Sequence, residues 1–437
     1  MASETVEQRI ERACKDHEIP GLIMVAGDSS GQPIYKKAFG NRSLKDGKPD
    51  PMPLDAVMWL ASCTKLVTTV AVLQCVDKGL LSLDDDITTV LPELKDVQVL
   101  TGFEKGEKGE DKPVLKENTK TITLRNMITH TSGLSYDIFS KYNSIFNDKR
   151  SKKGTAAKRQ TDPVLMRFRA TQGITPAIFI TAPLPDALTF PLLFQPGESW
   201  DYSVGIDWAG WAVERVSKLS LEEYFQKNIW GPLGVSSMTF FPKKHPEILK
   251  KVVDMSIREG GVTMFANPKD PNGKVVYSED PLWNIDMSAC SGGAGLYGAP
   301  IDYFKLLQSL LVNDEKLLKK SSVDKMFEPQ LNEAGINGLK EKLAYPDVNI
   351  QMSNHPMGTE TNFGLGSGLL MEDLPGRWKE GTLFWSGYPN LHWYIDRKSG
   401  IASIMGSQTH GPGDPKFVEF SRLWSEEIFR KAGKGKL

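Results

Sequence analysis

A serine and a lysine lie three residues apart at the start of a helical pattern. Ser62 ends an apolar run, 57–61, and Lys65 follows one helical turn later. In a helix that begins at Ser62, both side chains leave the same face. A serine becomes a strong nucleophile when a neighbouring base takes its proton, and a desolvated lysine can be that base. The spacing is therefore that of a nucleophile–base pair.

The same two residues also have a purely structural interpretation. Serine is a preferred helix cap, and Ser62 could do nothing else. The spacing is also common, because Ser322 and Lys325 repeat it in a short segment that Pro329 soon ends. The pair alone leaves both interpretations open.

A long helix is predicted directly behind Ser62. Apolar residues recur at steps of three and four, Lys78 supplies a basic last turn, and Gly79 supplies a stop. No such helix follows Ser322. The apolar positions are Leu66, Val67, Val70, Ala71, Leu73, Val76 and Leu80.

The composition is that of a globular protein without a strong overall charge. The chain has 437 residues, 40% of them hydrophobic and 24% charged, with a formal net charge of -1. Such a charge gives no field that attracts nucleic acid or an anionic membrane. The basic segment 149–159 contains no aromatic residue for base stacking, so we interpret it as a solvated loop. We expect neither nucleic acid nor membrane as a partner.

Cysteine and histidine usage predicts no metal and no cofactor. The cysteines are scattered without metal-ligand spacing, and no His-x-x-His cluster occurs. They are expected to be free thiols in a reducing, cytoplasmic compartment. The N-terminal residues show no signal-peptide pattern, and no apolar run reaches the length of a membrane span. A helix start beside Ser62 could lower the pKa of Cys63, although a packing role is favoured. The cysteines are Cys14, Cys63, Cys75 and Cys290.

Strand patterns occur at both ends of the chain and helical patterns in the middle. A hairpin is predicted over 22–26 and 34–39, and an antiparallel meander over 363–407. The simplest packing makes one sheet from both ends. We therefore predict an α/β fold, with a central antiparallel sheet flanked by helices and a mostly helical domain inserted. The first domain would comprise 1–80 and 215–437, and the helical domain 81–214, with the active site at their interface.

Several motifs together resemble the serine β-lactamase and penicillin-binding-protein superfamily, in particular its class C-like (family VIII) esterase branch. They span nearly the whole chain in the expected order. Within that branch, 71–75, 130–136 and 207–210 resemble the fungal statin-polyketide side-chain acyltransferases and related esterases. The motifs are 62–65; 124–134, which ends in His-Thr-Ser-Gly-Leu; 196–203; 224–234; 292–297; and 363–366.

The resemblance implies a β-lactamase/transpeptidase-like fold and a role for each motif residue. Ser62 would be the nucleophile, Lys65 its base and Tyr202 a second proton shuttle. The alternative for Tyr202 is a buried aromatic residue whose hydroxyl caps a loop. Backbone N–H groups of Ser62 and Tyr388 would form the oxyanion hole.

Two departures from the family pattern concern the substrate. The strand motif is Trp385-Ser386-Gly387, where lactamases carry a lysine that meets the substrate carboxylate. Tryptophan cannot supply that charge. Val204 stands where lactamases have an asparagine. An apolar pocket wall suits a neutral ester, although Trp385 could also be ordinary sheet packing.

These features predict a serine esterase or acyltransferase that works through an acyl-Ser62 intermediate. Its substrate would be a polyketide-like or other small neutral ester with a short acyl group. Water as the acceptor gives an esterase, and an alcohol gives a transferase, with an acyl-carrier protein or coenzyme A thioester as an alternative donor. A β-lactamase or peptidase is disfavoured by Trp385 and Val204. A non-catalytic binding protein is disfavoured because Ser62, Lys65 and Tyr202 are all present.

Overall fold

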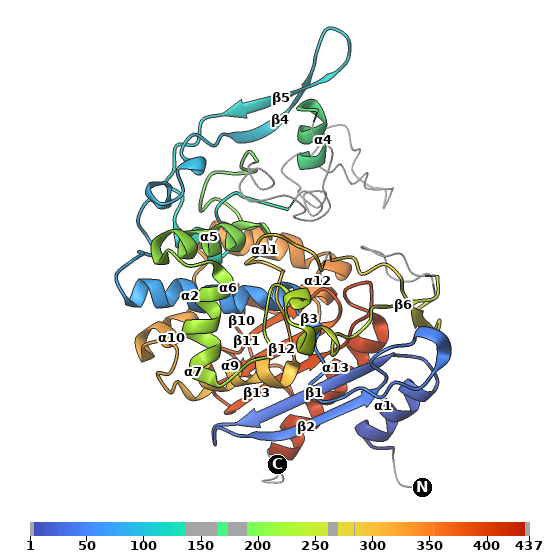
Figure 1. Cartoon of the computed structure of the whole chain (residues 1–437). Coiled ribbons are helices and arrows are strands. Elements are labelled where there is room, and N and C mark those ends of the chain that lie inside the picture. The colour runs from blue at the N-terminus through green and yellow to red at the C-terminus, as the bar shows by residue number, and fades with distance from the viewer. Residues whose placement is uncertain are drawn as a thin grey trace.

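A seven-stranded antiparallel sheet forms the centre of the molecule. The computed structural model describes residues 4–136, 164–173, 190–260, 270–283, 285–352 and 354–432, so the basic segment 149–159 lies outside the described residues. The strand order is β2-β1-β13-β12-β11-β10-β9 (Figure 1). The strands are β1 (Gly21–Asp28), β2 (Pro33–Gly40), β9 (Thr361–Phe363), β10 (Gly368–Leu370), β11 (Leu383–Gly387), β12 (Leu391–Asp396) and β13 (Ile401–Gly406).

The two ends of the chain meet in this sheet. β1 pairs with β13 over six residues, from Ile23 opposite Gly406 to Asp28 opposite Ile401. On its other side β1 pairs with β2, which is the predicted N-terminal hairpin. The prediction of one antiparallel sheet built from both chain ends is confirmed.

Helices cover both faces of the sheet because strand side chains alternate between faces. Leu22 and Met24 pack with α1 (Val6–Lys15) and α13 (Pro415–Ala432) in one apolar cluster. Ile23 and Val25 belong to a second cluster with α2 (Thr64–Asp77) and α9 (Pro300–Val312). The same alternation along β11 places Phe384 on the α13 face and Trp385 on the α2 face. Trp385 therefore lies on the side of the sheet that carries Ser62.

The remaining helices are mostly short. α5 (Gly205–Ser217) packs along α2 on the side of the molecule where the middle of the chain gathers (Figure 1). The remaining helices are α3 (Leu124–Ile128), α4 (Val164–Thr171), α5 (Gly205–Ser217), α6 (Leu221–Phe225), α7 (Gly231–Leu233), α8 (Pro246–Leu249), α10 (Lys320–Met326), α11 (Glu333–Leu343) and α12 (Pro346–Met352). None of the helices in the described ranges is long and apolar enough to cross a membrane.

Three two-stranded pairs complete the described structure. β3 (Met58–Trp59) pairs with β8 (Tyr297–Gly298), and β6 (Ser256–Arg258) pairs with β7 (Val275–Tyr277). β4 (Val99–Lys105) and β5 (Asp111–Lys116) form a hairpin that extends away from the sheet (Figure 1). The boundary between a sheet domain and a helical domain at residues 81–214 stays a prediction.

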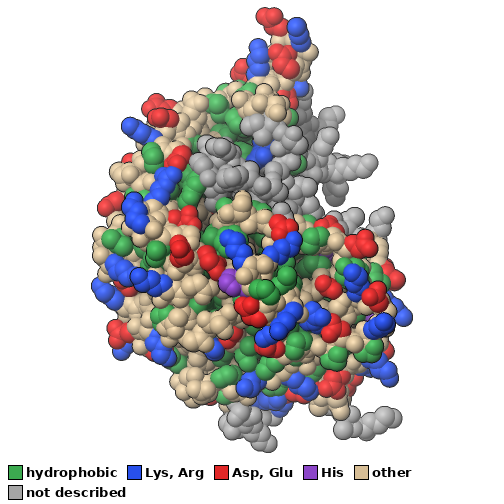
Figure 2. All heavy atoms as spheres, in the orientation of Figure 1, with side chains coloured by type: hydrophobic (Ala, Val, Ile, Leu, Met, Phe, Trp, Pro, Cys, Tyr) green, Lys and Arg blue, Asp and Glu red, His purple; other side chains and the backbone are tan. Residues whose placement is uncertain are grey.

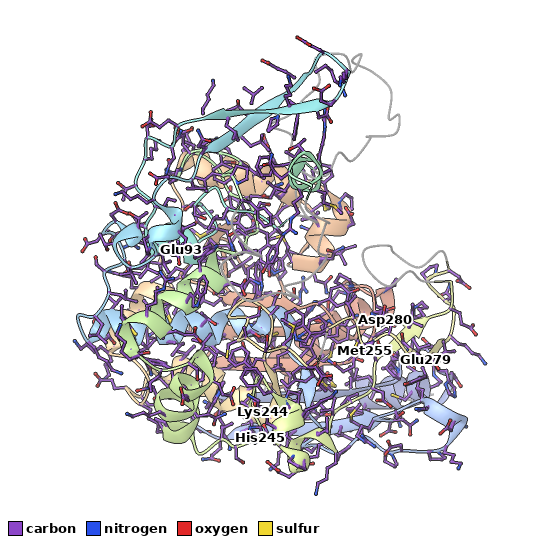
Figure 3. The ribbon with its side chains drawn as sticks, turned by 45° about the horizontal axis from the view of Figure 1, so that its top comes forward. Glu93, Lys244, His245, Met255, Glu279 and Asp280 are labelled. Atoms are coloured by element: carbon purple, nitrogen blue, oxygen red, sulfur yellow. The ribbon has the colours of Figure 1, made fainter. Side chains whose placement is uncertain are left out.

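Ion pairs and loop contacts join the parts of the chain. Arg215 on α5 pairs with Glu93, and Nη1 of Arg215 donates to Glu93 at 2.9 Å. The segment after β7 folds back, because Ser278 N donates to the carbonyl of Met255 at 3.0 Å. Figure 3 shows Met255, Glu279 and Asp280 together, away from Glu93. On the face in Figure 2, basic and acidic side chains are interspersed, in keeping with the net charge of -1.

Candidate active site

Ser62 lies in a 3-10 turn between a strand and a buried helix. β3 pairs with β8, and the N–H of Leu60 donates to the carbonyl of Leu296 at 2.9 Å. The turn Ala61–Cys63 follows, and α2 begins at Thr64. Ala61 has a φ of 45°, a left-handed conformation that strains a residue with a Cβ. Such strain is common beside functional side chains, and Ala61 directly precedes Ser62.

The hydroxyl of Ser62 does not cap the helix. The N-cap residue of α2 is Cys63, and no side chain caps it. Ser62 Oγ is instead within hydrogen-bond distance of Lys65 and Tyr202. The repeat of the motif differs, because Ser322 donates to Asp77 at 2.5 Å and Lys325 is exposed. The helix-cap interpretation of Ser62 is therefore wrong for this structure.

Lys65 is buried, and each of its amine protons has an acceptor. Nζ donates to Gly293 O at 2.7 Å, to the Tyr136 hydroxyl at 3.0 Å and to Ser62 Oγ at 3.3 Å. The side chain is 1% exposed. Lys65 Nζ also lies 4.6 Å from the centre of the Tyr202 ring, and the face of an aromatic ring attracts a cation. Three acceptors match the three donors of an ammonium group, so this geometry is that of charged Lys65.

Tyr202 reaches Ser62 from the segment before α5. Its hydroxyl donates to Ser62 Oγ at 2.7 Å. The preceding residue holds this segment in place: the carboxylate of Asp201 pairs with Lys342 on α11 at 2.8 Å and accepts from Ser135. Both partners of this ion pair are buried. The pair fixes the backbone from which Tyr202 extends.

His130 supports Tyr202 without carrying a charge. It has a φ of 60°, and its Nδ1 accepts from the N–H of Ser203 at 3.2 Å. Burial, and secondly the charge of Lys65, lower the pKa of His130 well below its usual value. Its ring packs against Tyr202 with the ring centres 4.9 Å apart. The histidine is therefore a neutral packing group at neutral pH.

Tyr136 and Asp207 complete the surroundings of Lys65, and neither was singled out from the sequence. Burial, and then the Asp207 carboxylate, raise the pKa of Tyr136 well above its usual value. Burial also raises the pKa of Asp207, against the opposing charge of Lys65. Both residues lie within segments that resemble the fungal enzymes, 130–136 and 207–210. That resemblance was the available signal, but it assigned them no role.

The end of β11 packs directly against the Ser62 turn. A Cβ on Gly387 would lie 2.5 Å from the carbonyl oxygen of Leu60, so only glycine allows this approach. Trp385 packs its ring 5.5 Å from that of Tyr202. Ser386 donates to the carbonyl of Gln351 on α12 at 2.6 Å, which ties the strand to that helix. The three predicted pocket residues are thus brought to Ser62, although the Trp385 side chain is also part of the core.

One pocket opens at Ser62. Its wall is mainly apolar and aromatic, with the Asp201–Lys342 pair as its charged part. Tyr388 lines it too, as expected for the residue after the β11 motif. The oxyanion-hole role of the backbone N–H groups of Ser62 and Tyr388 stays a prediction. The lining residues are Ser62, Trp200, Asp201, Tyr202, Lys342, Val348, Gln351, Met352, Trp385, Ser386, Tyr388 and Pro412.

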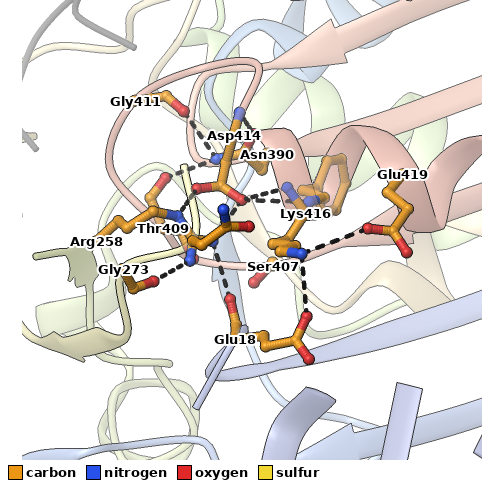
Figure 4. A network of polar contacts seen from close by, with 12 residues as sticks. Glu18, Arg258, Gly273, Asn390, Ser407, Thr409, Gly411, Asp414, Lys416 and Glu419 are labelled. Carbon is orange, nitrogen blue, oxygen red and sulfur yellow. Dashed lines mark hydrogen bonds and ion pairs between the residues drawn. The ribbon is translucent and has the colours of Figure 1, made fainter. Parts of the chain in front are cut away.

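A polar network holds the loop that carries Pro412 (Figure 4). Asn390 donates to the carbonyls of Thr409 and Gly411, at 2.9 and 3.1 Å, and accepts from the N–H of Asp414 at 3.0 Å. The Asp414 carboxylate pairs with buried Arg258 at 2.7 Å. The network connects β6, β12 and α13. This wall of the pocket is therefore fixed by buried hydrogen bonds.

Cys63 is fully buried in the apolar core beside Ser62. Burial raises the pKa of its thiol, and the charge of Lys65 opposes that effect only in part. The possibility of a lowered pKa is thus wrong, and the packing role is confirmed. Among the described residues, no group of three or more His, Cys, Asp or Glu side chains is arranged to hold a metal ion.

Comparisons with known proteins place the chain among acyl-transferring and ester-cleaving enzymes. A model of the beta-lactamase family matches residues 6–424. The lovastatin esterase of Penicillium rubens is 35% identical over 429 residues, which cover 98% of each chain. The monacolin J acid methylbutanoyltransferase of Aspergillus terreus is 32% identical over 436 residues, covering 98% of this chain and 96% of the relative. A mutant simvastatin synthase from Aspergillus terreus superimposes with a TM-score of 0.83 at 32% identity, covering 98% of this chain and 95% of that structure.

Proposed function

The chain belongs to the beta-lactamase family, as its motifs predict, and on that basis we propose that it carries an acyl group on Ser62. It is an enzyme of the serine hydrolase and acyltransferase type. The observation that carries the proposal is the contact of Ser62 Oγ with both Lys65 and Tyr202, at 3.3 and 2.7 Å. A nucleophile held by two proton-transfer groups is what covalent catalysis requires.

The reaction would proceed in two proton-coupled steps. In the first, with one proton already lost from the Lys65/Tyr202 pair, Ser62 Oγ attacks the carbonyl carbon and that pair takes its proton. The tetrahedral intermediate then releases an alcohol or thiol, which receives that proton, and acyl-Ser62 remains. In the second step, water or an acceptor alcohol loses a proton to the same pair and attacks the acyl group. Serine regains its proton as the acid or new ester leaves.

The charge at Lys65 favours this sequence. An ammonium group beside Ser62 and Tyr202 stabilises negative charge as it develops on either oxygen. The backbone N–H groups of Ser62 and Tyr388 would receive the carbonyl oxygen of the intermediate. Each is assigned from the family pattern and from the packing of β11 against the Ser62 turn.

The pocket favours a neutral, largely apolar ester. Trp385 replaces the lysine that meets the carboxylate of a β-lactam, and the cation of Lys342 is already neutralised by Asp201. The relatives are named for lovastatin cleavage and for methylbutanoyl transfer to monacolin J acid. We therefore propose a polyketide-like alcohol moiety and a short branched acyl group. An acyl thioester, on coenzyme A or an acyl-carrier protein, is the candidate donor for transfer. We assign the reaction to the cytoplasm because the four cysteines are free.

One assay separates hydrolysis from transfer. The enzyme is incubated with a polyketide methylbutanoate ester, the matching free alcohol and a methylbutanoyl thioester whose acyl group carries an isotopic label, and each product is followed by mass spectrometry. New ester formed from the thioester identifies a transferase. Cleavage of the ester with no new ester, in the presence of the thioester, removes the transferase alternative. If neither the ester nor the thioester is consumed, the proposed substrate class is wrong.

A β-lactamase is the second candidate, supported by the family alone. A chromogenic cephalosporin and a short-chain nitrophenyl ester are compared at equal concentrations. We expect the ester to be turned over much faster, because the lysine of the strand motif is absent at Trp385. Equal rates would contradict the neutral-ester proposal.

A further inference from the structure

A carboxylate is buried behind Lys65, and the proposed reaction does not use it. Asp207, in the first turn of α5, is 1% exposed. Its Oδ1 accepts from Ser291 Oγ at 2.7 Å and from the N–H of Gly293 at 2.9 Å, and the Tyr136 hydroxyl lies against the same carboxylate. A buried charge is costly unless another charge or hydrogen bonds offset it. The position of Asp207 therefore needs a partner charge.

Asp207 and Lys65 hold the same loop through the two backbone polar groups of one residue, Gly293. The N–H of Gly293 donates to Asp207, and the carbonyl of Gly293 accepts from Lys65 at 2.7 Å. A Cβ on Gly293 would lie 2.3 Å from Asp207 Oδ2 and 3.0 Å from the Tyr136 hydroxyl. The glycine thus allows the carboxylate, the phenol and the loop to meet without a gap.

The groups around the amine come from three further parts of the chain. Tyr136 and His130 follow α3, Tyr202 precedes α5, and Asp207 lies on α5. His130 is neutral, and burial keeps Tyr136 in its phenol form. Of these groups, Asp207 is the carboxylate. The charge of Lys65 in turn favours the ionised form of Asp207.

We propose that Asp207 is a positioning residue: its charge holds Lys65 as an ammonium group, and its hydrogen bonds hold the Gly293 carbonyl on that amine. This inference rests on the proposed function, in which Lys65 serves Ser62. An anion near an amine favours the charged form, and a fixed acceptor fixes the direction of the amine. Asp207 touches neither Ser62 nor the pocket; it acts through Lys65.

The first test is the pH dependence of Ser62 labelling by an alkyl phosphonate in Asp207→Asn. Asparagine keeps an oxygen for Ser291 and Gly293 but removes the charge. The charge that supports the amine is then gone, so the pH profile of labelling moves to lower pH. The control is Asp396→Asn: Asp396 is also 1% exposed and accepts two backbone N–H groups, but lies at the far end of β12. A profile that coincides with wild type overturns the inference.

A second test needs no activity and still applies if Asp207→Asn alone folds poorly. Lys65→Met leaves Asp207 buried without its counter-charge, so the thermal midpoint falls. Adding Asp207→Asn to Lys65→Met removes that charge, so the midpoint rises again. An Asp207→Asn change that lowers the midpoint equally in both backgrounds contradicts the coupling.

The two proposals fail in different ways. If wild-type Ser62 is not labelled, the proposed function fails, but the stability coupling of Lys65 and Asp207 still decides the inference. If Ser62 is labelled and neither the pH profile nor the coupling responds, only the role of Asp207 fails.

Discussion

The hydroxyl of Tyr202 lies 2.7 Å from Oγ of Ser62, across 140 residues of chain. Neither residue belongs to the other's secondary-structure element. Ser62 lies in the strained turn before α2. The backbone before Tyr202 is held by the buried ion pair between Asp201 and Lys342 on α11. The meeting of the two hydroxyls therefore depends on how helices and sheet pack, and it makes Tyr202 a partner in proton transfer to and from Ser62.

Tyr202→Phe removes that partner while keeping the ring. We expect kcat/KM for a nitrophenyl ester to fall by about 10²–10⁴-fold, the usual contribution of a positioned acid–base group. The thermal midpoint should change little. Tyr224→Phe is the matched control, because this buried tyrosine lies on α6 outside the pocket. Equal rates in wild type and Tyr202→Phe would remove Tyr202 from the mechanism.

Gly387→Ala tests the close approach of β11 to the Ser62 turn. The added methyl group would lie 2.5 Å from the Leu60 carbonyl oxygen, so the strand must move away. A displacement of about 1 Å at a reacting centre can cost about 100-fold in rate. We expect a loss of that order in the rate of phosphonate labelling. In the control Gly79→Ala the methyl group meets open space, so only local backbone strain is added and labelling keeps its rate.

Lys342→Met tests the ion pair that anchors the Tyr202 segment. Asp201 would be left buried and unpaired, which costs about 3–5 kcal/mol of unfolding free energy. Urea denaturation measures the loss. Adding Asp201→Asn should recover most of it, because the uncompensated charge is then removed. A single variant as stable as wild type would show that the pair is not a structural anchor.

Histidines with lowered pKa values predict a loss of stability in mild acid; His130 and His355 are buried, and His392 is half-buried. Burial lowers the pKa of His392 to about 4 and that of His355 to about 3, and lowers that of His130 further. The unfolded chain binds these protons below about pH 6.5, whereas the folded chain does not. The contribution of these histidines to the free energy of unfolding is therefore fully present above that pH. It decreases as the pH falls towards the pKa values of the folded state. Each histidine contributes about 1.4 kcal/mol per pH unit.

The measurement is urea denaturation at pH 7, 6 and 5. His392→Asn should reduce the loss between pH 6 and 5 by about 1.4 kcal/mol, the contribution of one histidine. Unfolding free energies that do not change between pH 7 and 5 would contradict this linkage.

Local sequence patterns were sufficient to predict part of this structure. Ser62 and Lys65 are three residues apart, so helical geometry alone brings them together. The hairpin of β1 and β2 and the terminal meander are periodic strand patterns with turn residues between them. Tyr202 came from the family resemblance. Its distance to Ser62 depends on tertiary packing, which no local pattern describes.

The residues that the sequence did not indicate all act across long separations. Lys65 and Tyr136 are 71 residues apart, and Lys65 and Gly293 are 228 apart. Nothing in the local sequence of Asp207 or Lys342 distinguishes a buried charge from a solvated one. The strand character of β4 and β5 was also missed, because the charged and glycine-containing segment has little apolar periodicity.

Intact-mass analysis after treatment with a serine-directed alkyl phosphonate tests the central claim most directly. The account predicts one adduct per wild-type molecule, located at Ser62 by peptide mapping, and none in Ser62→Ala. Ser322→Ala, at the second copy of the motif, should be labelled like wild type. An unlabelled wild-type protein, or an adduct that persists in Ser62→Ala, would contradict Ser62 as the acyl-accepting nucleophile.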